Sequence, residues 1–267
     1  MTPKASRLTL RFLALGYLGL LLAAPVGLVF YRTFEHGLAP ALDAVTTPEA
    51  LHAFWLTIVM VLVAVPANTV FGVITAIALV RQKFPGRALL NAVIDLPFAV
   101  SPVVIGLALI LVYGQGGWFG TWLAEHGIQV IFSVPGMILA TMFVSLPFVV
   151  REVQPVLREI GTEQEQAAAT LGASGWQTFW RVTLPSIRWG LSYGVVLATA
   201  RALGEFGAVS VVSGKIQGQT ETATLFVEDR FHQFDLTGAY AASFVLALLA
   251  IGTLLSMNIL NRRQRGT

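Results

Sequence analysis

Two oppositely charged residues, Arg201 and Glu205, lie inside an otherwise apolar stretch of the sequence, 189–214. A charge at membrane depth costs about 2.5 to 3.5 kcal/mol on insertion scales, so both residues need a structural or functional reason. Because they are four residues apart, they share one face of a helix and can neutralise each other. The favoured interpretation is an internal ion pair that fixes this helix against a neighbour. The alternative is an anion path, in which Arg201 attracts the anion and Glu205 limits how tightly it is held.

Proline and small polar residues also interrupt the apolar stretches, and Ser101 with Pro102 is the preferred pathway candidate among them. Proline leaves a backbone carbonyl without its donor, which is tolerated at membrane depth only against protein or a water-filled cavity. Ser210, on the same stretch as Arg201, completes the candidate pathway. The other interruptions are expected to serve ordinary helix packing: Pro66, Asn68, Pro97, Gly106, Ser145, Pro147, Gly190, Ser192 and Gly194.

The sequence lacks the residues for several kinds of enzyme chemistry. It contains no cysteine, which excludes disulfides, thiolate nucleophiles and thiolate metal sites. Gly214 and Lys215 are followed by Ile216, so this pair does not form a phosphate-binding P-loop. The four histidines are scattered without ligand spacing. We therefore expect no catalytic residue, metal or bound cofactor in this chain, and its energy source must be a partner or an ion gradient.

The elements that carry these residues follow from composition. The chain has 267 residues, of which 55% are hydrophobic and 12% charged, whereas charged residues approach a quarter of a typical soluble protein. Six nearly uncharged windows can each hold the roughly 20 residues that a helix needs to cross a bilayer. The sequence therefore predicts an all-α polytopic membrane protein. Its six predicted transmembrane helices are 12–31, 53–80, 96–118, 127–150, 189–214 and 236–261, and the first of them is expected to be an uncleaved anchor.

The basic residues orient this predicted bundle. Thirteen of the 17 lie on one side of the windows and three on the other, with Arg201 inside a window. By the positive-inside rule both termini are cytoplasmic, and the net charge of +3 reflects topology rather than nucleic-acid binding. The thirteen are Lys4, Arg7, Arg11, Arg81, Lys83, Arg87, Arg151, Arg158, Arg181, Arg188, Arg262, Arg263 and Arg265.

A 36-residue cytoplasmic loop, 151–186, has the sequence signals of helices rather than of a linker. Thr162 and Glu165 have the spacing of a capping box, in which each side chain satisfies a free backbone N–H at a helix start. Three alanines follow, and Gly172 suits a left-handed C-terminal cap. Ser174 and Gln177 form a second capping box. Two short helices joined at a glycine elbow are therefore expected on the inner membrane surface.

The two halves of this loop differ in character. The second half carries three aromatic residues and is typical of an amphipathic helix lying on the membrane: Trp176, Phe179 and Trp180. The first half, 163–172, has neither a bulky apolar stripe nor a basic face. Its small side chains allow another protein to approach closely, which favours docking of a partner.

These residues resemble a motif in the membrane subunits of bacterial ABC importers, which reads Glu-Ala-Ala, three residues, Gly, nine residues, then Ile-x-Leu-Pro. The matching residues are Gln166, Ala167, Ala168, Gly172, Val182, Thr183, Leu184 and Pro185. Gln166 replaces the Glu of the motif and Val182 its Ile. Glu165 can supply the missing charge from the neighbouring helical position.

The resemblance extends over about 51–226 and is to the CysW-type permease subunits of sulfate/thiosulfate importers. The stretches that carry it are LHAFWLTIVMVLVAVPANTVFGV, DLPFAVSPVVIGLALIL, FVSLPFVVREVQPVL, LGASGWQTFWRVTLPSIRWG and ARALGEFGAVSVVSG. The last is the most specific. Molybdate and tungstate permeases are similar in the loop motif and fold but match this last stretch less closely.

The resemblance implies a type I ABC importer permease (MetI-like) fold over 51–261, after an anchor segment, 1–50, and before a short tail, 262–267. It implies a bacterial inner-membrane protein that moves the oxyanion by alternating access. The implied partners are a CysT-type permease, two CysA-type ATPases that bind ATP and Mg²⁺, a periplasmic sulfate/thiosulfate-binding protein and the lipid bilayer. The residues implied to couple to the ATPase are Glu163, Glu165, Gln166, Ala167, Ala168, Leu171 and Gly172.

Two alternatives belong to other functional classes. A gradient-driven carrier is expected to contain inverted repeats or buried acidic proton sites. No repeat is evident, and only Asp95 and Glu205 are candidate proton sites. An intramembrane enzyme is not supported, because the sequence has neither a metal-ligand cluster nor a nucleophile constellation.

Overall fold

The computed structural model describes residues 3–264, and the regular secondary structure of this part of the chain is all helical. The elements up to the middle of the chain are α1 (Pro3–Leu18), the π-helix η1 (Gly19–Ala23), α2 (Ala24–Phe34), α3 (Leu38–Val45), α4 (Pro48–Arg81), α5 (Arg87–Ala99), α6 (Pro102–Tyr113) and α7 (Gly120–Glu125). The remaining elements are α8 (Val134–Glu159), α9 (Glu163–Thr170), α10 (Gly175–Thr178), the π-helix η2 (Phe179–Thr183), α11 (Leu184–Leu203), α12 (Gly207–Val212), α13 (Ala223–His232) and α14 (Leu236–Gln264).

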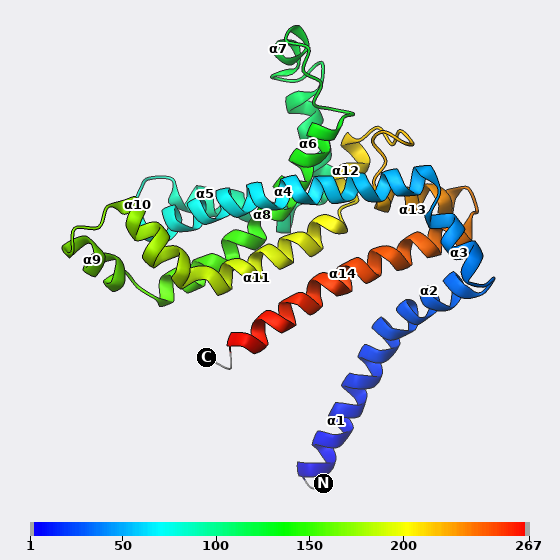
Figure 1. The fold of residues 1–267 in the computed structure, drawn as a ribbon, viewed down its shortest axis with the longest axis horizontal. Helices are drawn as coiled ribbons and strands as arrows, with labels where there is room; N and C mark the ends of the chain where they lie inside the picture. The colour runs from blue at the N-terminus through cyan, green and yellow to red at the C-terminus, as the bar shows by residue number, and fades with distance from the viewer. Residues whose placement is uncertain (1–2, 265–267) are drawn as a thin grey trace.

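Long helices side by side form the body of the molecule (Figure 1). Within residues 3–264, the stretches long and apolar enough to cross a membrane without a break are Thr9–Phe34, Pro48–Arg81, Val134–Glu159 and Leu236–Leu255. The bent pair of α5 and α6 is a fifth candidate. The predicted all-α membrane bundle is confirmed, but among the described residues four spans, or five with the bent pair, stand where six were predicted, because two of the windows contain interrupted helices.

The third predicted window, 96–118, is not one helix. α5 and α6 meet at an angle of 119°, with Ser101 between them in an extended conformation (ψ 136°). The residue before a proline is pushed out of the helical region by a clash with the proline ring, and Pro102 follows Ser101 directly. This local constraint explains the break. α6 consequently turns away from the direction of α5 and packs against α12, and α7 lies beyond the long helices (Figure 1).

The fourth and fifth windows also differ from their predicted bounds. Helix α8 covers Val134–Glu159 instead of 127–150, so the predicted loop that starts at Arg151 begins as helix. The fifth window is divided, because α11 ends at Leu203 and α12 starts at Gly207. Both breaks, before α6 and before α12, lie in windows that were expected to be continuous.

The N-terminal helix stands apart from the body of the chain. None of the apolar window within Thr9–Phe34 is buried inside the chain, and α1 diverges from α14 in Figure 1. Its contacts are at its C-terminal end, where Phe30 and Phe34 lie edge-on to Phe244, with ring centroids 5.0 and 5.3 Å away. Thr33 donates a hydrogen bond to the carbonyl of Tyr240 at 3.1 Å. α14 therefore fixes the end of this helix, while most of its length is free to contact lipid or another chain.

The helices α4, α8 and α11 pack closely because small residues lie at their crossings. A Cβ on Gly72 would come within 2.7 Å of Val149, and one on Gly190 within 2.8 Å of Val156. Asn68 of α4 donates to Ser145 of α8, with 2.9 Å between Nδ2 and Oγ. Substituting these small residues would separate the helices, so the expected packing role of Asn68, Ser145 and Gly190 is confirmed.

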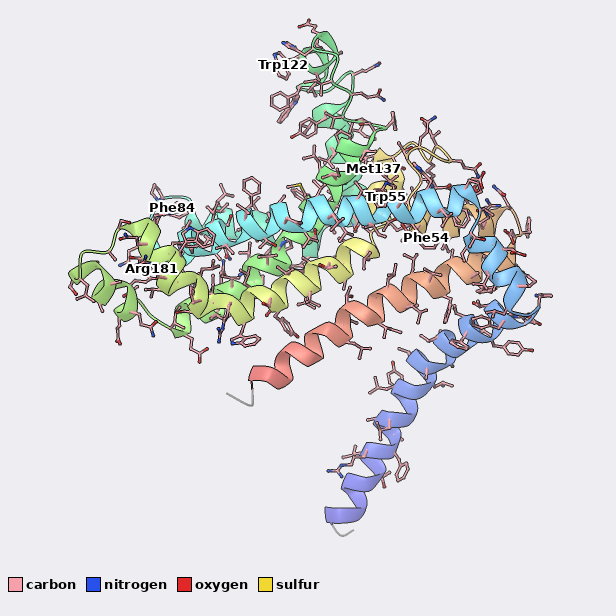
Figure 2. The ribbon with its side chains drawn as sticks, in the orientation of Figure 1. Phe54, Trp55, Phe84, Trp122, Met137 and Arg181 are labelled. Carbon is pink, nitrogen blue, oxygen red and sulfur yellow. The ribbon has the colours of Figure 1, made fainter. Side chains whose placement is uncertain are left out.

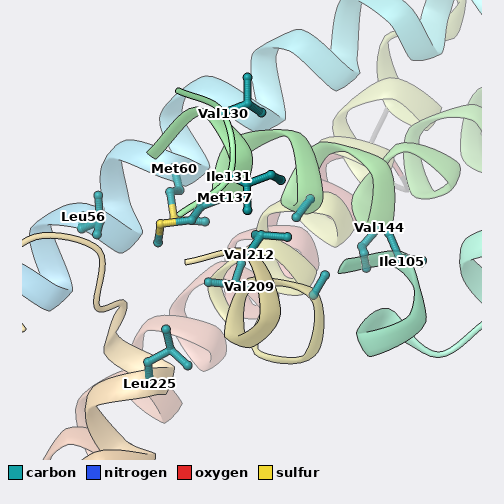
Figure 3. Packing of buried hydrophobic residues seen from close by; sticks show 12 residues of the cluster. Leu56, Met60, Ile105, Val130, Ile131, Met137, Val144, Val209, Val212 and Leu225 are labelled. Carbon is teal, nitrogen blue, oxygen red and sulfur yellow. The ribbon is translucent and has the colours of Figure 1, made fainter. Parts of the chain in front are cut away.

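Two buried clusters lie along this bundle. One cluster is near α9 and joins α4, α5, α8 and α11: Val73, Ala76, Leu79, Ile94, Val149, Val150, Val153, Leu157, Ile187 and Ala198. The other, drawn in Figure 3, joins α4, α6, α8, α12 and α13. Met60, Met137 and Val209 lie at the centre of the second cluster (Figure 3). The bundle therefore has a packed core at both ends of its long axis.

Candidate functional site

The elbow between α9 and α10 contains the glycine cap that the sequence predicts at the C-terminal end of α9. Gly172 has φ +82°, a left-handed conformation that glycine adopts without a Cβ clash. The N–H of Ala173 donates to the carbonyl of Ala168, and that of Gly172 to the carbonyl of Ala169, both at 3.0 Å. This pair of bonds defines a Schellman cap. The predicted glycine cap is confirmed, and it fixes the angle between α9 and α10.

The start of α10 is also as predicted. The N–H of Ser174 donates to Gln177 Oε1 at 2.9 Å, and the N–H of Gln177 donates to Ser174 Oγ at 3.3 Å. This is the reciprocal arrangement of a capping box. It depends only on residues three apart, which is why the sequence is sufficient to predict it.

The first predicted capping box, Thr162 with Glu165, is wrong. Thr162 has ψ 1° and its side chain caps no backbone N–H. It instead accepts a hydrogen bond from Gln166, with 3.0 Å between Nε2 and Oγ1. Glu165 is bound to Arg81, and this charged partner competes successfully with a neutral backbone N–H because charge-assisted bonds are stronger.

Arg81, the last residue of α4, holds this carboxylate among several acceptors. Its Nε lies 3.0 Å from Glu165 Oε2, and its Nη2 donates to Glu165 Oε1 at 3.3 Å. The same guanidinium donates to the carbonyls of Leu157 at 3.0 Å and Gly161 at 2.6 Å. Thr183 of η2 donates to Glu165 Oε1 at 2.9 Å. We call these five residues the Arg81 network.

The Arg81 network joins α4 to three elements that come much later in the chain. It connects the end of α4 to the end of α8, to α9 and to η2, the π-helix that leads into α11. The side chains of Arg81 and Glu165 are 14% and 21% exposed, so the pair is shielded from solvent on most sides. A displacement of α9 must therefore move these helices with it or break the network.

The remaining coupling candidates divide by the direction they face. Leu171 is 89% exposed, and the side chains of Glu163, Gln166 and Ala167 are exposed beside it. Ala168 is half-buried, as is Glu165. The motif departure at Gln166 is therefore on the outer face. Glu165 does not replace the motif's Glu there, because it is bonded inward.

Aromatic side chains follow this elbow on the side of α4. Trp176 is 71% exposed and Trp180 50% exposed, and their rings meet edge-on with centroids 5.5 Å apart. With Val70 and Ile74 of α4 they line an apolar cavity of about 730 Å³. This arrangement fits the expectation that the second half of the loop lies on the membrane surface.

A second candidate site lies where the two helix breaks meet. A Cβ on Gly207, the first residue of α12, would lie 2.8 Å from Pro102 Cβ. Farther along, a Cβ on Gly106 would lie 2.8 Å from the carbonyl oxygen of Ala208. The starts of α6 and α12 are thus in direct contact. Helices broken at membrane depth expose backbone groups to a cavity, which is how transporters often form ion sites.

The ion pair predicted at this depth is present. Arg201 Nη1 lies 2.6 Å from Glu205 Oε2. The Glu205 side chain is 1% exposed and that of Arg201 is 29% exposed. Glu205 also accepts a hydrogen bond from the N–H of Ala208 at 2.8 Å, so its carboxylate caps the first turn of α12. The carboxylate is sequestered, whereas the guanidinium remains partly accessible.

The two serines of the candidate pathway contact neither Arg201 nor Glu205 through a hydrogen bond. Ser101 is exposed at the break before α6. Ser210 is half-buried, and its hydroxyl donates to the carbonyl of Gly207 within its own helix at 2.9 Å. Pro102 and Glu205 are brought near each other through Gly207, but Ser101 and Ser210 remain pathway predictions.

The candidate proton site of the carrier hypothesis is also paired. Arg151 of α8 donates to Asp95 of α5, with 2.8 Å between Nε and Oδ1 and a second contact between Nη2 and Oδ2. Among the described residues, no group of three or more His, Asp or Glu side chains is arranged to hold a metal. No sequence pattern indicates Arg81, Thr183 or Arg151 as partners, because each contacts a residue outside its own helix.

A helical membrane bundle with two broken helices and an exposed α9–α10 elbow is compatible with a transporter permease, and sequence comparison identifies the family. The profile of the binding-protein-dependent transport system inner membrane component family matches residues 68–266, and the chain belongs to this family. It is therefore a multi-pass membrane protein and a transmembrane component of a transporter.

Within this family, the chain is similar to CysW-type permeases. The sulfate transport system permease protein CysW of Synechocystis sp. is 56% identical over 251 residues, covering 94% of this chain and 91% of the relative. CysW of Escherichia coli (strain K12) is 51% identical and covers 91% and 84%, respectively. The sulfate transport system permease protein CysT of the same strain is 40% identical over 244 residues.

Solved structures confirm the fold. A bacterial ABC transporter involved in import of the acidic polysaccharide alginate has a TM-score of 0.76, with 17% identity over 97% of this chain and 96% of the other. A bacterial alginate ABC transporter in complex with its alginate pentasaccharide-bound periplasmic protein has a TM-score of 0.77 at 16% identity. The predicted type I importer permease fold is thereby supported.

Proposed function

We propose that this chain is one permease half of an ATP-driven importer of sulfate or thiosulfate. The identity to sulfate permeases over nine-tenths of the chain supports the substrate class. The chain itself would be non-catalytic and would form half of the membrane path. ATP and Mg²⁺ would bind to a separate ATPase, since the sequence contains no P-loop.

The Arg81 network is the observation that carries the proposed mechanism. The exposed face of α9, with Leu171 at its end, would fit into the surface of the ATPase. When the ATPase closes on ATP, α9 would move, and the contacts of Arg81 with Glu165 would transmit this movement to α4 and α8. The spans would then alternate between outward and inward openings, because each ligand state favours one arrangement.

The partners of this permease are proposed from its relatives. A CysT-type permease would supply the second half of the path, since CysT relatives are about as long and 40% identical. Two CysA-type ATPases would dock, one at the elbow of this chain and the other at the corresponding elbow of the CysT-type permease. A periplasmic sulfate- or thiosulfate-binding protein would deliver the anion, a proposal supported by the alginate transporter solved with its periplasmic protein. The excess of basic residues at the α9 end supports cytoplasmic termini in the bacterial inner membrane.

At the broken helices, Arg201 would attract the anion as it passes. Its accessible guanidinium supplies positive potential, while Glu205 neutralises much of it. A transporter must release what it binds, so this partial neutralisation would prevent a deep trap. The pair would thus serve both packing and transport.

Uptake by the reconstituted four-chain complex with its binding protein tests this function. Proteoliposomes would be given labelled sulfate, thiosulfate or molybdate, with ATP or its non-hydrolysable analogue inside. We expect sulfate or thiosulfate uptake that requires ATP hydrolysis. Molybdate uptake in preference to sulfate would contradict the substrate class. Uptake driven by a proton gradient without ATP would support a secondary carrier, an alternative disfavoured by the pairing of Asp95 with Arg151 and of Glu205 with Arg201.

A further inference from the structure

A small cavity, distinct from the helix breaks, opens at the α9 end of the molecule and shares no lining residue with the Arg81 network. Its volume is about 380 Å³, and its lining comes from α4, α5 and α8: Leu79, Arg87, Ala88, Asn91 and Arg158. Leu79, 2% exposed, forms an apolar floor. The polar groups around this floor are two guanidinium groups and one amide, with no carboxylate among the lining residues. Phe84, labelled in Figure 2, marks the turn between α4 and α5, and this turn leads to Arg87 and Ala88 at the start of α5.

The two arginines of this cavity are unpaired, unlike several others in the chain. Arg81, Arg151 and Arg201 each contact a carboxylate. Among the side chains that the structure describes, no Asp or Glu lies within ion-pair distance of Arg87 or Arg158. The cavity therefore has a positive potential from two guanidiniums, neither of which forms an ion pair with an acid in the described part of the chain.

The chemistry of these groups selects one kind of ligand. A guanidinium presents its N–H donors in a planar fork that matches two oxygens of a phosphate or sulfate group. The Asn91 amide can donate a further hydrogen bond. Basic cavities between transmembrane helices on the cytoplasmic side are a recurring way to bind anionic head groups.

We propose that this cavity binds a tetrahedral oxyanion, held by Arg87 and Arg158. The anion has two possible sources with the same chemistry. It is either the head-group phosphate of an anionic phospholipid in the inner leaflet or a free sulfate or phosphate ion in the cytoplasm. Occupation would draw the start of α5 to the end of α8, and hence to the turn that precedes α9.

Binding to the purified four-chain complex, without the periplasmic binding protein, tests this site. One arm measures retention of dioctanoyl phosphatidylglycerol by native mass spectrometry after delipidation. The other arm measures the thermal shift caused by sodium sulfate, compared with sodium chloride at equal ionic strength. The variant R87Q/R158Q is compared with the control K83Q/R181Q, which removes two exposed charges that do not line the cavity.

We expect R87Q/R158Q to weaken binding in one or both arms about tenfold or more, while K83Q/R181Q retains the wild-type affinity. Loss in the lipid arm alone identifies the phospholipid as the ligand, and loss in the sulfate arm alone identifies the free anion. Equal affinity of R87Q/R158Q and the wild type in both arms would overturn the proposal. An equal loss in the control would also overturn it, because the effect would then be one of general charge.

A conservative variant keeps the test valid if R87Q/R158Q does not assemble. R87K/R158K retains both charges but loses the planar forks. It is expected to assemble and to bind the probe several-fold more weakly than the wild type. Unchanged binding by this variant would contradict the bidentate arrangement.

Discussion

The chain contains two arginine–carboxylate pairs whose positions in the sequence and the structure differ. At the elbow, Arg81 contacts Glu165, a residue 84 positions away, and the pair joins helices that are separate in sequence. At the helix breaks, Arg201 contacts Glu205 only four positions away, and the carboxylate also caps the next helix. The first pair can transmit movement between elements, whereas the second fixes local geometry. The same kind of ion pair is therefore proposed to serve coupling at one site, whereas at the other it fixes the start of α12.

The largest effect is expected from a bulky residue at the elbow. Gly172→Trp places an L residue at φ +82°, which costs about 1–2 kcal/mol, and adds bulk where the ATPase is proposed to dock. We predict that the permease still enters the membrane but that ATP-dependent sulfate uptake falls to near background. Gly175→Trp, at an exposed glycine with ordinary φ and open space, is the matched control. Wild-type uptake by Gly172→Trp would refute the role of the elbow.

Removing the carboxylate at the helix breaks should cost the most stability. Glu205→Ala leaves Arg201 without its partner and the N–H of Ala208 without an acceptor. Breaking one side of a buried pair typically costs about 3–5 kcal/mol. Glu165→Ala should cost less, about 1.5–3 kcal/mol, because this pair is partly exposed. Thermal unfolding of the purified complexes measures both, and the opposite order would reverse our ranking of the two pairs.

Removing the arginine at the same place should affect transport more than assembly. In Arg201→Ala, Glu205 retains its bond to the N–H of Ala208, so α12 keeps its cap. We predict that the variant assembles with a lowered unfolding temperature, because the buried carboxylate loses its counter-charge, and that sulfate uptake falls about tenfold, corresponding to about 1.4 kcal/mol. Arg201→Lys, which preserves the charge, should recover part of the uptake. Loss of assembly in Arg201→Ala would instead assign the pair a purely structural role.

Glu221 is a buried carboxyl that forms no ion pair with an arginine in the described structure, and it provides a third case for comparison with the two pairs. Its substitution is expected to have a smaller effect than those above. Glu221 lies between α12 and α13, is 2% exposed, and its Oε2 has no hydrogen-bond partner in the described structure. Burial, followed by the charge of Asp229, raises the pKa of Glu221 to about 7.

Because the folded-state pKa is raised, the wild type should lose stability as the pH rises from about 4.5 to 7. In Glu221→Gln this contribution to the pH dependence should disappear, as measured by thermal unfolding between pH 5 and pH 8 relative to the wild type. Identical pH profiles of the two proteins would show that Glu221 stays ionised at little cost.

The sequence predicts the features that depend on near neighbours. The cap at Gly172, the Ser174–Gln177 capping box and the Arg201–Glu205 pair each involve residues within six positions, and all three are confirmed. The Thr162–Glu165 box has equally good spacing but is wrong, because Arg81 from another helix takes the carboxylate. Local spacing indicates which contacts are possible, and tertiary structure decides among them.

The interrupted spans show the same limit at a larger scale. The sequence marks Ser101, Pro102 and Pro97 as interruptions, but hydropathy alone averages across them into one window. The 119° bend depends on the clash before Pro102 and on the contact of Pro102 with Gly207 of α12. Neither the angle nor the partner helix can be derived from composition.

The number of ATP molecules hydrolysed per sulfate imported tests the central claim most directly, that the Arg81 network transmits the movement of α9 to the spans. Glu165→Gln retains the size of the side chain but removes its charge. We predict that this variant assembles, hydrolyses ATP and consumes several-fold more ATP per sulfate than the wild type. Glu159→Gln, at an exposed acid near the end of α8, is the control and should retain the wild-type ratio. A wild-type ratio in Glu165→Gln would contradict the claim.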